Sequence, residues 1–157
     1  MEEIIYSRAT PEDLETIIDL RIAFLLELSG PPSSESIQEL KRHFRNYLER
    51  SLQDNYFIVY LARCGNDIAG IGGMVIREQP GSFKNPGGKV GYIMNMYTVP
   101  SFRKKRIGSN ILRLLRVDAG KMGIVAFELH ATEQGENMYR QDGFVKYGET
   151  TYRKYMG

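Results

Sequence analysis

Hydrophobic residues in the first third of the chain recur every three to four positions, which is the spacing of amphipathic helices. Residues 10–28 open with Thr-Pro-Glu-Asp, a helix-start sequence, and continue with regularly spaced Leu and Ile. The stretch SGPPSS at 29–34 ends this helix, and residues 34–55 repeat the helical pattern. The sequence therefore predicts two consecutive helices, preceded by a short β-prone run at 4–9.

The period then changes to that of β-strands. Residues 56–64 are aromatic and β-branched, and a Gly-Asn-Asp turn joins them to a hairpin partner at 68–78. After a loop rich in proline and glycine, residues 90–99 form a mostly apolar strand. The amphipathic run 107–122 and the apolar run 124–131 then predict a helix and a buried strand. This strand–helix–strand unit indicates a crossover that makes its two strands parallel.

The last part of the chain predicts a short helix at 133–142 and a closing hairpin at 144–156 around Gly148. The resulting order of elements is β-α-α-β-β-β-α-β-α-β-β, without an internal repeat or a linker. Such alternation predicts an α/β protein with a mixed sheet and helices on its faces.

Composition and charge narrow the class of protein. The 157 residues suit one domain, 1–157, and 42% hydrophobic with 25% charged residues is typical of a folded globular chain. The net charge of +2 argues against a polycation that coats nucleic acid. Cys64 is the one cysteine, and His43 and His130 lack zinc-ligand spacing, so neither a disulfide nor a metal site is expected. The start of the chain has no signal-peptide pattern and no run could span a membrane, which favours a cytoplasmic setting.

Four cationic residues, Arg103 to Arg106, stand at the start of the helix 107–122. A helix N-terminus already carries partial positive charge, so this is an unfavourable place for cations unless an anion lies in front of them. The first amides of a helix have no intrahelical acceptor and bind phosphate well, and Gly108 would allow close approach. Two other interpretations remain open: a solvated basic loop, and a small nucleic-acid patch.

Two segments of the sequence resemble the cofactor motifs of a known family. The strand YIMNMYTVP, the loop SFRKKRIGS and the helix NILRLL resemble the acetyl-CoA-binding motif of the GNAT N-acetyltransferases, with Arg103, Arg106 and Gly108 at its three defining positions. Arginine stands at 106, where the family usually has glycine. The segment LHATEQGENMYRQDGF at 129–144 resembles the second cofactor segment of the family, and the order of elements matches along essentially the whole chain.

The resemblance implies a three-layer GNAT-like fold, with a mixed, mostly antiparallel sheet of about six to seven strands and four helices. It also implies acetyl-CoA as cosubstrate, with no metal, and a set of residues that contact it. These are Tyr97, Thr98, Val99, Arg103, Lys104, Lys105, Arg106, Ile107, Gly108, Ser109 and Asn137.

The resemblance further implies direct transfer of acetyl to an amine, with Tyr139 as the general acid for the leaving thiolate. A splay between the strands 90–99 and 124–131 would leave backbone donors free, and the Val99 N–H would polarise the thioester carbonyl. The sequence names no general base. Asn95 cannot take a proton, and Glu128 and Glu78 are more often solvated strand carboxylates.

The function predicted first is an acetyl-CoA-dependent N-acetyltransferase that acts on a primary amine of a small molecule or peptide. The alternative is a non-catalytic acyl-CoA-binding or sensing module on the same fold. Neither interpretation involves nucleic acid or a membrane as partner. The sequence does not identify the acceptor amine, and the closing hairpin could pair across a homodimer.

Overall fold

The computed structural model describes residues 2–157, so only Met1 of the expected domain lies outside it. The strands are β1 (Ile4–Arg8), β2 (Phe57–Cys64), β3 (Asp67–Glu78), β4 (Lys89–Thr98) and β5 (Ala126–Leu129). The helices are α1 (Leu14–Ser29), α2 (Ser34–Ser51), α3 (Ile107–Lys121) and α4 (Glu136–Gln141), with short 3-10 turns at Pro11–Asp13 and Pro100–Phe102.

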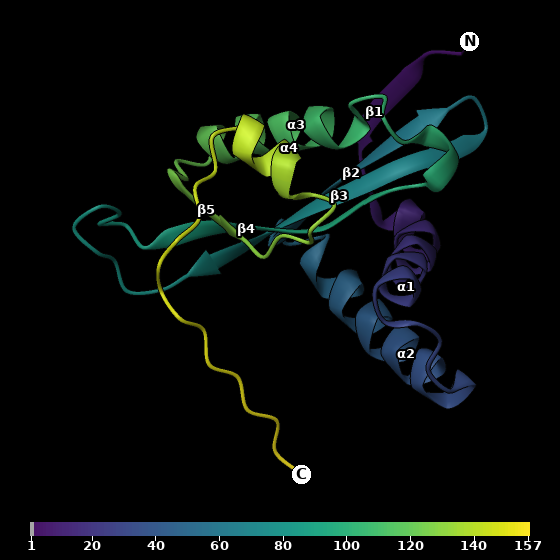
Figure 1. The fold of residues 1–157 in the computed structure, drawn as a ribbon, viewed down its shortest axis with the longest axis horizontal. Coiled ribbons are helices and arrows are strands. Elements are labelled where there is room, and N and C mark those ends of the chain that lie inside the picture. Colours follow the sequence, from purple (N-terminus) through teal and green to yellow (C-terminus); the bar gives the residue numbers. More distant parts are fainter. Residues whose placement is uncertain (1) are drawn as a thin grey trace.

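The five strands form one sheet in the order β1-β2-β3-β4-β5. The first four are mutually antiparallel, and β5 is parallel to β4, as the crossover through α3 predicted. Helices α1 and α2 lie on one side of the sheet and α3 and α4 on the other (Figure 1). Each face has its own core: Ile111 and Leu115 of α3 are fully buried on one side, and Ile18 and Leu48 of α1 and α2 on the other. The three layers and the mixed sheet confirm the predicted fold class.

The helix-start sequence before α1 caps the helix, as predicted. The Asp13 carboxylate accepts the backbone N–H of Thr10 at 2.9 Å in a capping box, and Pro11 occupies the first turn. At the start of α2, the Ser33 hydroxyl accepts the Ser36 N–H at 3.2 Å. These caps fix where the two helices begin. Helix α1 borders the site described below.

Strand β4 carries the irregularity that opens the sheet. Its register against β3 shifts between Ile71 and Gly73, and Asn95 adopts a left-handed backbone with a φ of 57°. Pairing with β5 stops at Ile93–Leu129, whereas β4 continues to Thr98. The last residues of β4 therefore have no neighbour on the β5 side, and the two strands part there.

The closing hairpin predicted at 144–156 is wrong for this chain, which is why the sheet has five strands and not six to seven. Residues 144–157 contain no helix or strand, and they lead away from the body of the molecule (Figure 1). Tyr152 is 91% exposed, and Val145 and Tyr155 are similarly exposed. A hairpin needs an apolar surface to pack on, and β5 offers an edge of only four residues.

No helix among residues 2–157 has the length and apolar character needed to cross a lipid bilayer.

Candidate active site

A cavity of about 1050 Å³ lies where β4 and β5 part. Its walls come from the end of β4, from α1 on one side of the sheet, and from the start of α3 and all of α4 on the other. Among residues 2–157, every residue that the sequence assigned to the site lines this cavity except Val99 and Lys105. The fold therefore brings together the two segments, 97–109 and 137–139, that the sequence singled out.

The start of α3 forms one end of the cavity with unused backbone donors. The first helical bond runs from the Asn110 N–H to the Arg106 carbonyl at 3.0 Å. Within the described chain, the amides of Ile107, Gly108 and Ser109 have no acceptor, and no side chain caps this end. Such a set of amides at a helix N-terminus suits a phosphate group.

Arg106 explains why the motif usually has glycine at its position. As the residue before α3, it has a φ of 60° and a ψ of 24°, the left-handed conformation that costs an L-residue roughly 1–2 kcal/mol. The loop thus keeps the shape that a glycine would adopt freely, and the amides of α3 remain in place.

Arg106→Gly is therefore expected to raise the free energy of unfolding by about 0.5–1 kcal/mol, because relief of the left-handed strain exceeds the entropy cost of glycine. Urea denaturation measures this change. Arg106→Ala is the matched control, since it removes the same charge and keeps the strain. A glycine variant less stable than the alanine variant would contradict the strain argument.

Gly108 lines the cavity and also packs against α4. A Cβ at this position would lie 2.8 Å from the Met138 Sδ, closer than real contacts allow. The glycine lets α4 come close against α3, so the two helices that wall this side of the cavity are in direct contact.

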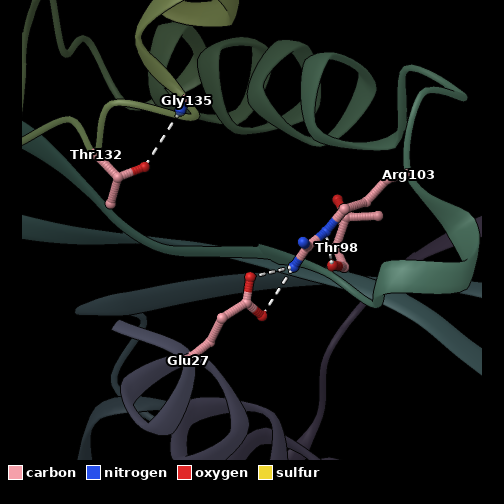
Figure 2. Close-up of polar contacts among 5 residues, drawn as sticks. All are labelled: Glu27, Thr98, Arg103, Thr132 and Gly135. Carbon is pink, nitrogen blue, oxygen red and sulfur yellow. Dashed lines mark hydrogen bonds and ion pairs between the residues drawn. The ribbon is translucent and has the colours of Figure 1, made fainter. Parts of the chain in front are cut away.

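Arg103 lies across the cavity from α1 and binds the protein itself. Its Nε donates to the Thr98 carbonyl at 3.0 Å, and its Nη2 donates to both Glu27 carboxylate oxygens at 2.8 and 2.9 Å (Figure 2). The guanidinium also lies 5.7 Å from the centre of the Tyr97 ring. Since its donors are engaged this way, a contact between Arg103 and a diphosphate stays a prediction.

The backbone donor assigned to Val99 is corrected by the structure. The Val99 N–H donates to the Ala69 carbonyl of β3 at 2.9 Å, so it is not free to polarise a thioester. Successive amides of a strand point to opposite edges, so the N–H of Thr98 faces the opening beside β5. Lys105 also lies outside the cavity lining, with its ammonium 5.4 Å from the centre of the Phe102 ring.

Tyr139 is buried in α4 with 8% of its surface exposed, at the cavity wall. Its ring packs edge-on against Phe144, and its hydroxyl has no hydrogen-bond partner within residues 2–157. Burial, and to a lesser extent the Tyr92 hydroxyl, raise the pKa of Tyr139 to about 12.

The Thr132 hydroxyl accepts the Gly135 N–H at 3.2 Å and so fixes the turn that leads into α4 (Figure 2).

Two further polar residues, Asn95 and His130, line the cavity although the sequence assigned neither of them a role there. Asn95 is 3% exposed, and neither its side-chain oxygen nor its nitrogen has a partner in the described chain. His130 follows β5, and its Nδ1 lies 2.8 Å from the Tyr92 hydroxyl. An unpaired buried amide costs about 1–3 kcal/mol, and both polar atoms of Asn95 are shielded from the surface.

The two carboxylates considered as bases lie elsewhere. Glu128 is exposed on β5, and an oxygen of its carboxylate lies 3.7 Å from Arg77, while Glu78 is exposed at the end of β3. Neither lines the cavity. The imidazole of His130 does, and imidazole is the side chain that most often accepts a proton near neutral pH.

Fold and site together define an α/β protein with a split sheet, a helix end with free amides and a buried phenol in one cavity. The family model of the acetyltransferase (GNAT) family matches residues 20–144, and the chain belongs to this family. It is an acetyltransferase by family, which makes acetyl-CoA its expected cosubstrate. No curated protein sequence matches the chain.

Solved structures share this fold. A predicted acetyltransferase with acetyl-CoA from Clostridium acetobutylicum has a TM-score of 0.89 at 24% identity, covering 97% of this chain and 96% of that one. A GCN5-related N-acetyltransferase from Ralstonia eutropha has a TM-score of 0.86 at 25% identity, covering 97% and 99%. An aminoglycoside acetyltransferase from an uncultured soil metagenomic sample, in complex with sisomicin, has a TM-score of 0.71 at 16% identity, covering 98% and 95%.

Proposed function

We propose that this protein transfers an acetyl group from acetyl-CoA to a primary amine by direct attack. The observation that carries the proposal is one cavity that joins the unused amides of α3, the open edge of β4 and the unpaired hydroxyl of Tyr139. A diphosphate needs donors such as the free amides, a thioester carbonyl needs a donor such as the open edge of β4 offers, and a leaving sulfur needs a donor such as the phenol.

Each feature has a place in the reaction. The amides of Ile107, Gly108 and Ser109 bind the diphosphate, and the N–H of Thr98 donates to the thioester oxygen as negative charge develops there. The amine nitrogen attacks the carbonyl carbon, a C–N bond forms and the C–S bond breaks. Coenzyme A leaves as a thiolate, which then takes a proton from solvent. Holding the amine beside the thioester supplies most of the rate enhancement.

Tyr139 assists the departure of sulfur. With a pKa of about 12 its phenol is neutral at any physiological pH, so its proton is always available to donate. Because an ordinary thiol has a pKa of about 8.5, complete transfer of that proton is uphill. The phenol therefore acts first as a hydrogen-bond donor to the developing thiolate.

The proton of the attacking amine goes to His130 in this proposal. The imidazole lines the cavity and is held by Tyr92, on the side of β5 next to the reacting groups. This role requires the proton of the ring to sit on Nδ1 and point to the Tyr92 oxygen, which leaves Nε2 as the acceptor.

The test is thiol release from acetyl-CoA with a panel of primary amines between pH 6 and 9. We expect acetyl-CoA to raise the melting temperature and at least one amine to be acetylated, with a rate that rises with pH as the amine loses its proton. Mass spectrometry of the product distinguishes acetylation from hydrolysis. Binding of acetyl-CoA without transfer to any amine would favour the acyl-CoA-sensing alternative.

A further inference from the structure

Arg21 of α1 stands where the main cavity meets a second, smaller one. It lines the 1050 Å³ cavity and also a pocket of about 270 Å³ between α1, α2 and the sheet. Met94 of β4 lines both as well. The two spaces therefore adjoin at Arg21, on the α1 and α2 side of the sheet, away from the end of α3 that we assign to the diphosphate.

Arg21 is partly buried and makes no ion pair or hydrogen bond within residues 2–157. Two acids of α1 pair with other residues: Glu15 with Arg45, and Glu27 with Arg103. Asp19, two positions before Arg21, is exposed and lines neither cavity. Burial lowers the pKa of Arg21, and the Tyr92 hydroxyl opposes this only in part. Partial burial of an unpaired guanidinium is unfavourable, and an anion of the ligand would compensate it.

The charge of this half of the cavity is positive. The Glu27 carboxylate accepts two hydrogen bonds from Arg103, so its charge is neutralised, and the other cavity acid, Glu133, belongs to the segment before α4 on the opposite wall. A polycationic acceptor would meet Arg21 without a compensating carboxylate beside it. An acceptor with a negative group next to its amine would meet a free guanidinium.

The smaller pocket is lined mainly by apolar and aromatic side chains. Phe44 and Tyr47 of α2 have ring centres 6.5 Å apart, and Tyr47 and Phe57 have theirs 5.8 Å apart. Leu40 and Met94 complete the apolar lining, and His43 is also at its wall. This pocket suits an apolar or aromatic group of the acceptor.

We propose that the acceptor is a small amine that carries both a carboxylate and an apolar group, as apolar α-amino acids do. The carboxylate pairs with Arg21, the apolar group enters the pocket of Phe44, Tyr47 and Phe57, and the amine faces the thioester. This inference rests on the proposed function and specifies its substrate class. The reaction stays balanced: the amine nitrogen gains the acetyl group and loses a proton, and the sulfur leaves as a thiolate, which then takes a proton from solvent.

The experiment compares phenylalanine with 2-phenylethylamine, which differ by the carboxylate alone, and includes glycine, spermidine and kanamycin. We expect kcat/KM for phenylalanine to exceed that for 2-phenylethylamine by about tenfold or more, as a charge-assisted pair with arginine predicts. Glycine, which lacks the apolar group, and the two polycations should be poorer acceptors than phenylalanine.

Arg21→Met tests the residue itself. It keeps the apolar stem and removes the charge, so it should lower kcat/KM for phenylalanine by about 10-fold or more and leave 2-phenylethylamine within about threefold. Arg21→Lys should restore part of the loss, since lysine keeps the charge without the paired geometry. Arg42→Met is the matched control: Arg42 is exposed on α2 and lines neither cavity, so its loss should change neither substrate.

The outcomes separate the two proposals. Equal use of phenylalanine and 2-phenylethylamine, preference for a polycation, or equal loss of both substrates in Arg21→Met would overturn the acceptor class and leave acetyl transfer standing. Absence of transfer to every amine would overturn both. The thermal shift with acetyl-CoA, measured on each variant, shows that the fold and the cosubstrate site are intact.

Discussion

Tyr139→Phe is expected to lower kcat for acetyl transfer by about 100-fold, within the usual range for loss of a general acid, while the affinity for acetyl-CoA stays within about threefold. The substitution removes only the hydroxyl, which has no protein partner in the described chain, so the fold loses no hydrogen bond. Steady-state kinetics with a saturating amine measure kcat, and calorimetry measures the affinity.

Tyr60 supplies a matched control for this experiment. Its pKa is also raised to about 12, but its hydroxyl donates to the Asp118 carboxylate of α3 at 2.6 Å, and neither Tyr60 nor Asp118 lines the cavity. Tyr60→Phe should cost about 1 kcal/mol or more of stability and leave kcat unchanged. If Tyr139→Phe kept the wild-type kcat, Tyr139 would have no part in the mechanism.

Ser109→Pro is expected to weaken acetyl-CoA binding by about 10- to 100-fold. Proline has no N–H, so the variant deletes one of the free amides at the start of α3 without changing any charge, and a hydrogen bond to a charged group is worth about 1.5–3 kcal/mol. The first turn of a helix tolerates proline, which keeps α3 formed. Calorimetric titration with acetyl-CoA measures the loss, and circular dichroism checks the helix.

Ser109→Ala is the partner variant, because it removes the hydroxyl and keeps the amide. It should bind acetyl-CoA within about threefold of the wild type. An equal loss in both variants would assign the contact to the side chain, and no loss in either would place the diphosphate away from this helix end.

The sequence predicted the fold well where the signal was local. The capping residues before α1, the 3.6-residue period of α3 and the strand–helix–strand crossover to β5 all depend on residues near one another, and all are confirmed. The hairpin at 144–156 also had a local pattern, but a hairpin is stable only against a partner surface. That surface is absent for residues 144–157, and the sequence pattern alone could not reveal this.

The site was predictable only in part, for a similar reason. Residues 103–109 and Tyr139 lie in contiguous sequence motifs, so the resemblance to the family identifies them without a structure. Arg21, Asn95 and His130 reach the cavity through the packing of α1, the bulge in β4 and the end of β5. Those positions depend on register and on contacts between distant elements. The error at Val99 has the same origin, since one residue of register decides which edge of β4 an amide faces.

The contact between Gly108 and Met138 has a geometric consequence for what the protein accepts. Met138 packs on Gly108 between α4 and α3, and the next residue, Tyr139, lines the cavity. The packing of α3 against α4 therefore sets the distance between the free amides at the start of α3 and the phenol of Tyr139. Under the proposed function, the arm of the thioester carrier has to span this distance, so the packing of Met138 on Gly108 bears on which carrier length fits.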